Sequence, residues 1–124
     1  MAEQERRFDD VCAWTDSCAL AGAMAFFAAW QDAAVIVNGP MWCHYFALRH
    51  VEHGVSDAVR RTGCTQLDND AIVFGAEDYL LEALQPYIAE PPRLLAIVSS
   101  CAAGLIGDDV AAILGFLDLL RVLL

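Results

Sequence analysis

The sequence predicts an α/β domain in which a small parallel sheet is flanked by helices. Three short apolar runs support this prediction, because each has the composition of a buried strand. The runs are AAVIVN (33–38), AIVFG (71–75) and RLLAIVSS (93–100). Segments with helical spacing alternate with them, which is typical of a Rossmann-like sheet of few strands with right-handed crossovers.

The first part of the domain is predicted to contain two helices. A helix is expected over residues 16–31, with Asp16 or Ser17 as its cap. Its small residues permit close packing of the backbone against a neighbour. A second helix is expected over residues 42–53, and Gly54 is expected to end it.

The second part is predicted to contain two further helices. The segment AEDYLLEALQPY (76–87) has apolar residues at helical spacing. Pro86 and the pair Pro91–Pro92 are expected to end that helix, because proline lacks the backbone N–H that a helix interior needs. After the third strand, the chain is expected to become helical again from Gly107 or Asp108 onward.

The length of the chain fits one domain. Its 124 residues are enough for a hydrophobic core and too few for two domains. Residues 1–15 are predicted to be a polar lead-in, and residues 16–124 a single α/β domain. Hydrophobic residues make up 58% of the chain, which is high for a water-soluble domain. The excess indicates apolar surface that is covered by a partner, a further domain or lipid.

The composition also disfavours several classes of protein. The charge-free apolar stretch of residues 17–31 is shorter than the ~20 residues of a spanning helix, so no membrane segment is predicted. The charged start lacks the apolar core of a secretory signal, which predicts a cytoplasmic protein with reduced thiols. The net charge of −10 disfavours nucleic acid and anionic lipid as direct partners.

The five cysteines form a pattern on this predicted sheet. Their odd number and the predicted compartment argue against a disulfide framework. Cys43 follows the first predicted strand and Cys101 the third, so both are expected at the carboxyl edge, where ligands of open parallel sheets collect. Cys18 lies in the first turn of the first helix, whose amino end can face the same edge and favours the thiolate.

Three thiolates at one edge suit a soft metal site. Structural zinc is disfavoured, because the chain has no closely spaced cysteine pair. An iron–sulfur cluster normally takes four cysteines or a substitute ligand. Three cysteines from one chain therefore imply a fourth ligand from elsewhere, most naturally from a second subunit.

Four segments carry a resemblance to a known family. They are CALAGA (18–23), NGPMWC (38–43), LDNDAIVFGAEDYLLEAL (67–84) and SSCAAGLIGDD (99–109). In this order they resemble the three cysteine motifs, and the segment between the second and third, of nitrogenase component 1-type oxidoreductases. That family includes nitrogenase molybdenum–iron protein subunits, cofactor-assembly scaffolds and dark-operative protochlorophyllide reductase-like enzymes.

The resemblance implies an oxidoreductase subunit that pairs with a second component 1-type subunit, as a homo- or hetero-oligomer. An iron–sulfur cluster would lie at the pairing interface, with Cys18, Cys43 and Cys101 as the ligands from this chain. Electrons would arrive from an ATP-dependent iron–sulfur reductase protein and pass to a bound substrate or cofactor.

Length is where the chain departs from the family. Family subunits are several times longer and contain three Rossmann-like domains, so this chain resembles the first domain, as a fragment or a truncated relative. A larger metallocofactor or tetrapyrrole site is therefore not expected within it, and catalysis would need the remainder. Two alternatives stay open. One is a non-catalytic cofactor-assembly scaffold or oligomerisation module of the same family, and the other is a cytosolic thiol-redox domain, although the usual C-x-x-C spacing is absent.

Other polar candidates have weaker support. Cys64 follows a glycine in a predicted turn and is a candidate additional ligand, while His44 could hydrogen-bond a cluster sulfur. For Cys12 and Cys64, a buried core thiol is the favoured interpretation. An ordinary polar contact is favoured for His44. His50 and His53 are expected to meet the dipole at the end of their helix rather than a metal.

Small and acidic residues are expected to shape the loops around the cluster and to cap the helix behind it. These residues are Gly39, Pro40, Gly104, Gly107 and Asp108. The two later glycines let the chain turn tightly after Cys101, and Asp108 is expected to cap the final helix together with Asp109.

Two further groups are assigned to ordinary structural roles. Trp42, Tyr45 and Phe46 are expected in the core or at a subunit interface rather than as a platform for substrate. Ser99 and Ser100 lack the G-x-S-x-G context of a nucleophile and are expected to bond nearby backbone at the end of the third strand.

Overall fold

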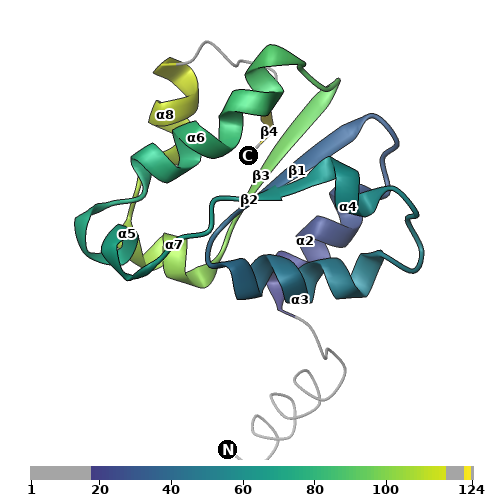
Figure 1. Cartoon of the computed structure of the whole chain (residues 1–124), viewed down its shortest axis with the longest axis horizontal. Helices are drawn as coiled ribbons and strands as arrows, with labels where there is room; N and C mark the ends of the chain where they lie inside the picture. Colours follow the sequence, from purple (N-terminus) through teal and green to yellow (C-terminus); the bar gives the residue numbers. More distant parts are fainter. Residues whose placement is uncertain (1–17, 117–121, 124) are drawn as a thin grey trace, which may run out of the picture.

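The structure is a computed structural model that describes residues 18–116 and 122–123 (Figure 1). Its centre is a four-stranded parallel sheet with strand order β2-β1-β3-β4. The strands are β1 (Ala33–Asn38), β2 (Thr62–Cys64), β3 (Leu94–Ser99) and β4 (Val122–Leu123). Helices flank the sheet, so the predicted Rossmann-like α/β architecture is confirmed.

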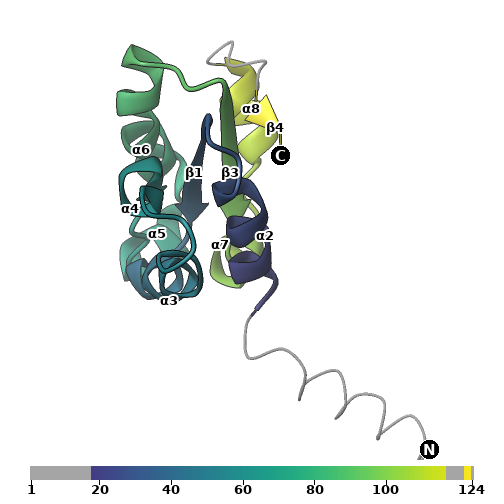
Figure 2. The ribbon, with the colours of Figure 1, turned by 90° about the vertical axis from the view of Figure 1, so that its right-hand side faces the viewer.

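Helices cover both faces of this sheet. In the described part of the chain they are α2 (Ala19–Ala28), α3 (Met41–Val51), α4 (Ala58–Arg61), α5 (Asn69–Phe74), α6 (Glu77–Ala89), α7 (Cys101–Ile106) and α8 (Val110–Phe116). In Figure 1, α6 and α8 lie on one side of the strands, and α2, α3 and α4 lie on the other. Figure 2 shows β1 and β3 between these helices from a second direction.

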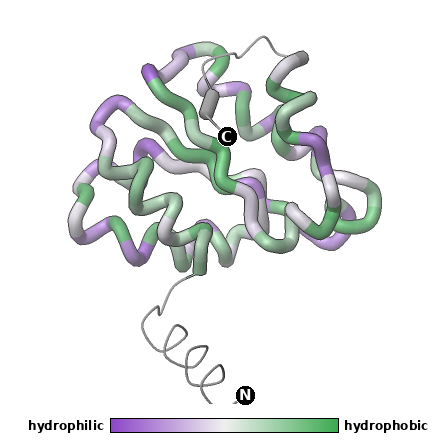
Figure 3. The backbone as a smooth tube through the Cα atoms, turned by 180° about the vertical axis from the view of Figure 1, so that it is seen from behind, coloured by the Kyte–Doolittle hydropathy of each residue, from purple (hydrophilic) through white to green (hydrophobic). Residues whose placement is uncertain are grey.

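Two of the three hydrophobic clusters of the described core pack against opposite faces of the sheet. Every residue of β1 is buried: Val35 and Val37 pack in the cluster with α2 and α3, and Ala34 and Ile36 pack in the cluster with α6 and α8. Figure 3 shows hydrophobic residues along the central strands. A strand covered on both faces needs apolar residues at successive positions, which is why the run AAVIVN predicts a strand so clearly.

The prediction of a strand over residues 71–75 was wrong, because these residues belong to α5 and the turn after it. Asp68 caps this helix by accepting a hydrogen bond from the Ala71 N–H at 3.0 Å, and Gly75, with φ of 103°, follows its end. Val73 and Phe74 are exposed, so the apolar run does not mark a buried strand here. The strand beside β1 is instead β2, which has only three residues.

The end of α6 also differs from the prediction. Pro86 lies inside the helix, which continues to Ala89 and ends before Pro91–Pro92. The cost is a missing N–H at a solvent-exposed position. Burial of Leu80 and Leu84 against the sheet outweighs that cost, since most helix stability in proteins comes from packing.

The chain after β3 becomes helical earlier than predicted. Helix α7 begins at Cys101, because the Ser100 Oγ accepts a hydrogen bond from the Ala103 N–H at 3.2 Å and caps it. Gly107 follows the end of α7 in the left-handed conformation, with φ of 77°. Helix α8 then begins separately, at Val110.

No helix among the described residues is long and apolar enough to cross a membrane. The predicted polar lead-in at residues 1–15, which contains Cys12, lies outside the described residues. The predicted helix caps Asp16 and Ser17 lie outside them as well.

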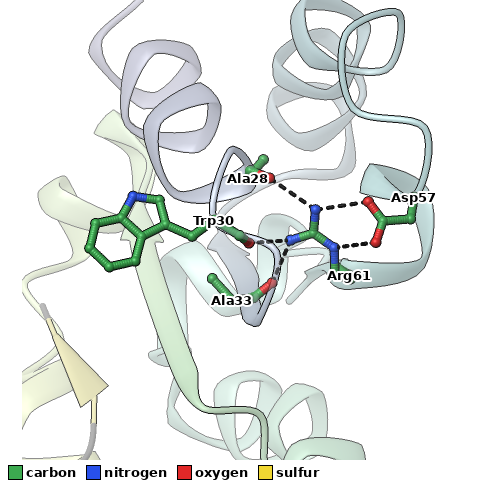
Figure 4. A network of polar contacts seen from close by, with 5 residues as sticks. All are labelled: Ala28, Trp30, Ala33, Asp57 and Arg61. Atoms are coloured by element: carbon green, nitrogen blue, oxygen red, sulfur yellow. Dashed lines mark hydrogen bonds and ion pairs between the residues drawn. The ribbon is translucent and has the colours of Figure 1, made fainter.

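Arg61 holds the amino edge of the sheet together (Figure 4). Its guanidinium donates hydrogen bonds to the carbonyl oxygens of Ala28, Trp30 and Ala33 at 2.9, 2.8 and 2.7 Å. It also donates to both carboxylate oxygens of Asp57 at 2.8 Å. Carbonyls at the end of a helix lack intrahelical partners, so this one side chain satisfies the end of α2 and joins it to the start of β1.

Replacing Arg61 with methionine is expected to destabilise the domain by about 2–3 kcal/mol, because several carbonyls lose a charged donor at once. Urea titration followed by circular dichroism measures the free energy of unfolding. Arg60→Met is the matched control, since Arg60 is exposed on the same helix. A loss no larger than that of the control contradicts the role given to Arg61.

The hydrogen bonds from Arg61 lower the pKa of Asp57. A carboxyl whose folded pKa is lowered stabilises the fold above its unfolded pKa, and the contribution is lost as the pH falls through the folded pKa. The difference in unfolding free energy between the wild-type chain and Asp57→Asn should therefore be full at neutral pH and shrink below about pH 4. In an Arg61→Met background this pH dependence should disappear, and its persistence there argues against the pairing as its cause.

Candidate functional site

The cysteines of the predicted ligand set lie at the starts of three helices. Cys43 is in the first turn of α3, directly after β1, and Cys101 is the first residue of α7, directly after β3. Cys18 is the N-cap of α2. Helix α2 contacts both α3 and β3, and β3 is the strand that leads into α7. Cys18 and Cys101 are exposed, and Cys43 is half-buried.

The turns after β1 and β3 touch each other. Asn38 and Ser99 form the last pair in the register of these strands, and Gly39 packs against Ser100 immediately beyond it. A methyl group on Gly39 would lie 2.5 Å from the Ser100 Oγ and 2.7 Å from its Cβ. The Ser100 N–H also donates to the Asn38 carbonyl oxygen at 2.9 Å. Glycine is therefore required at position 39, where Pro40 follows as the N-cap of α3.

A buried polar network ties the loop after β2 to the same place. In the described part of the chain, the buried polar side chains are Asn38, Thr65 and Ser100, and each lies at the carboxyl end of a strand. The Thr65 Oγ1 accepts a hydrogen bond from the Gly39 N–H at 2.9 Å and donates to the Asn38 Oδ1 at 3.1 Å. Buried polar groups need such partners, so the network fixes the relative positions of the loops.

Sequence reasoning missed this network. Asn38 and Thr65 were not among the candidate residues, although a polar residue at the end of the apolar run AAVIVN was a detectable sign. Thr65 had no comparable sign, because β2 itself was not predicted.

Cys64 ends β2 and is half-buried against the same turn. Its Sγ–H donates to the Gly39 carbonyl oxygen at 3.3 Å, and its sulfur accepts from the Gln66 N–H at 3.3 Å. Burial raises the pKa of Cys64, the Gln66 N–H lowers it, and the nearby Cys43 thiol raises it again. Cys64 therefore serves the loop as a hydrogen-bonding thiol.

The pKa of Cys43 reflects its burial and the two other thiols of the predicted ligand set. Burial raises the pKa of Cys43, and the Cys101 and Cys18 thiols raise it further, in that order. Like charges at short range disfavour the ionised form. The fold thus places these three cysteines close enough to interact. A metal centre among them would favour their thiolates, which are the forms that bind metal.

These thiols do not converge on one point. Within residues 18–116 and 122–123, no group of three histidine, cysteine, aspartate or glutamate side chains could hold a metal ion. An iron–sulfur cluster contains several irons, so its cysteine ligands are distributed around it rather than gathered at one ion. Soft thiols spread around one edge fit such a cluster better than a single-ion site.

The histidines are engaged elsewhere. The His44 Nε2 lies 3.3 Å from the Thr62 Oγ1, within hydrogen-bond distance, which links α3 to β2. Burial lowers the pKa of His44, so its ring is neutral near pH 7. His50 lies in the last turn of α3, and His53, beyond its end, is 3.8 Å from the carboxylate of Glu52.

The residues after Cys101 are arranged differently from the prediction. Gly104 lies within α7 with open space around it. Asp108 does not cap the final helix, because its Oδ2 accepts a hydrogen bond from the Ala76 N–H at 2.7 Å, at the start of α6. Asp109 alone caps α8, accepting from the Ala112 N–H at 3.0 Å. Asp108 therefore ties the α7–α8 turn to α6.

Three aromatic rings stand on the outer face of α3. Trp42, Tyr45 and Phe46, the α3 aromatic cluster, are 70%, 45% and 61% exposed. Their ring centroids lie 5.5 to 6.3 Å apart, so the rings pack against one another. The expectation that these three rings lie in the core is therefore wrong. The rings instead form an exposed apolar surface beside Cys43.

Replacing Gly39 with alanine is expected to cost about 1–3 kcal/mol, because the new methyl group overlaps Ser100 and must push the two turns apart. The free energy of unfolding in urea measures this. Gly104→Ala is the matched control: its methyl group enters open space within a helix, so it should be neutral or stabilise the chain by about 0.5–1 kcal/mol. Equal effects of the two substitutions would show that position 39 has room.

Comparison with known proteins agrees with this architecture. The model of the family described as Nitrogenase component 1 type Oxidoreductase matches residues 18–117. The chain is 29% identical over 100 residues to the nitrogenase iron-molybdenum cofactor biosynthesis protein NifE of Clostridium pasteurianum, covering 78% of this chain and 22% of that protein. It is 26% identical over 104 residues to the nitrogenase molybdenum-iron protein beta chain of Azospirillum brasilense, covering 84% and 19%.

A solved structure of nitrogenase Cp1 at pH 6.5 has the same fold. The TM-score is 0.68 at 16% identity, with 79% of this chain and 21% of that chain covered. The chain therefore spans about a fifth of the length of the relatives it matches. The family match includes Cys18, Cys43 and Cys101. The chain belongs to the nitrogenase component 1-type oxidoreductase family.

Proposed function

We propose that this chain is a nitrogenase component 1-like domain that holds an iron–sulfur cluster through Cys18, Cys43 and Cys101. The observation that carries the proposal is the placement of these three cysteines, distant in sequence, at the starts of neighbouring helices at one edge of the sheet. The cluster would supply electron transfer to a bound substrate or cofactor.

The chain's own residues prepare the site without metal. The contact between Gly39 and Ser100 holds the turns that carry Cys43 and Cys101 against each other. Cys18 and Cys43 lie at the amino ends of α2 and α3. Because the hydrogen bonds of Cys64 are already made within its loop, the proposed ligand set does not need it.

The proposal includes a second component 1-type subunit. Cys18 and Cys101 are exposed, so a cluster held by them would be open on one side. The α3 aromatic cluster is exposed on the same helix as Cys43, and exposed apolar patches commonly mark protein–protein contacts. An ATP-dependent iron–sulfur reductase protein in the cytoplasm would deliver the electrons.

A non-catalytic scaffold is the second candidate. It is favoured by the similarity to NifE, whose name describes cofactor biosynthesis. In this alternative the chain binds the cluster and pairs with a partner but reduces no substrate. Reduction of an added substrate when reductase and ATP are supplied supports the first candidate, and loaded protein that never turns over supports the second.

Anaerobic reconstitution with iron and sulfide is expected to give protein with bound iron, bound sulfide and visible absorption. Cys43→Ser should lose most of each, because Cys43 is one of the three proposed ligands. Cys64→Ser is the matched control, since Cys64 is a neighbouring half-buried thiol outside the proposed ligand set, and it should load normally. A wild-type chain that stays colourless and free of iron, with its fold intact by circular dichroism, contradicts the proposal.

A further inference from the structure

Cys43 and Cys101 are positioned as a pair by the backbone itself. The register of β1 and β3 ends with Asn38 beside Ser99, and the chains remain in contact one residue further, at Gly39 and Ser100. Pro40 and Cys101 are the next residues of the two chains after this contact. The Cys43 N–H donates to the Pro40 carbonyl oxygen at 3.0 Å, so Cys43 lies one tight turn beyond Pro40.

The two thiols differ in access to solvent. Cys101 is exposed, so a soluble oxidant can reach it, whereas Cys43 is half-buried. Both are free thiols in this structure. An exposed thiol that reacts first and a sheltered thiol that resolves the product are the two parts of a dithiol switch.

We propose that, in the metal-free chain, Cys101 and Cys43 form a reversible disulfide when the oxidant is a small disulfide such as oxidised glutathione. The Cys101 thiolate attacks one sulfur of the oxidant, which releases one glutathione thiolate and leaves a mixed disulfide on Cys101. The Cys43 thiolate then attacks the Cys101 sulfur and releases the second glutathione. The two protein thiols lose two electrons and two protons, and the oxidant is reduced to two molecules of glutathione.

The disulfide would consume two of the three proposed cluster ligands. Its effect on the cluster therefore rests on the proposed function. The oxidised chain should not bind iron, and the chain should bind iron again after reduction by excess thiol. This makes the carboxyl edge a site that either holds metal or protects its empty thiols from irreversible oxidation. Formation of the bond needs no metal, so it can be measured separately.

The test uses the full chain with Cys12→Ser, which removes the cysteine outside the described residues. The protein is incubated with oxidised glutathione without metal, free thiols are alkylated, and peptides are mapped by mass spectrometry. The expected result is a peptide pair joined through Cys43 and Cys101, with the loss of two hydrogen atoms, in monomeric protein. Cys18→Ser and Cys64→Ser are the matched controls and should leave the joined pair unchanged.

Two further variants separate the steps. Cys43→Ala should stop at the mixed disulfide and keep one glutathione on Cys101, and Cys101→Ser should give no joined pair. Because Cys101 is exposed, the second variant is expected to fold, which circular dichroism checks.

A disulfide that joins another pair, or full alkylation of Cys43 and Cys101 after oxidation, overturns the inference. If the bond forms but the reduced chain never binds iron, the proposed function fails and the dithiol switch stands. If the reduced chain binds iron but no disulfide forms, the inference of a dithiol switch fails and the proposed function stands.

Discussion

The close contact between Gly39 and Ser100 is the constraint on which the functional edge depends. Parallel strands keep their chains at a fixed spacing, but beyond the strands nothing obliges the two turns to stay together. Here they do, because position 39 has no side chain and Ser100 fills that space. The Ser100 hydroxyl also caps α7. Ser100 therefore both contacts the turn after β1 and begins the helix that carries Cys101. One contact therefore sets the distance between the two turns and the direction of the helix after β3.

The opposite edge of the sheet is organised by charge rather than by close packing. Arg61 gathers carbonyls from α2 and β1, and Asp57 holds the guanidinium in place. The two edges of the sheet therefore differ. The amino edge is stabilised by the hydrogen bonds of Arg61, and the carboxyl edge carries exposed thiols. The apolar excess of the composition is also accounted for, since large side chains of α3 and α5 and Leu105 of α7 are exposed. Such surface is typical of a domain that meets other protein.

Part of this arrangement could be predicted because local pattern and final structure agree. The run 33–38 is buried throughout and the run 94–99 is buried at its centre, and both are recognisable as strands for that reason. The prediction of strands from apolar runs was wrong where such a run does not lie in the sheet. Residues 72–74 are β-branched or aromatic, yet they lie in a helix capped by Asp68 and stay exposed. Sequence periodicity reports burial, so it misleads when apolar residues face outward.

The sequence by itself determined that the chain is a parallel α/β domain of this family, with cysteines after its first and third predicted strands. That information is local, because strands, turn glycines and motif order are read from neighbouring residues. Tertiary structure alone decided that Thr62–Cys64 would be a strand, that Thr65 would bond Asn38, and that Arg61 would reach three carbonyls. Each of these depends on groups that are 26 or more positions apart or on pairing with a neighbour already in place. Such partners become defined only once the sheet has brought their backbones together.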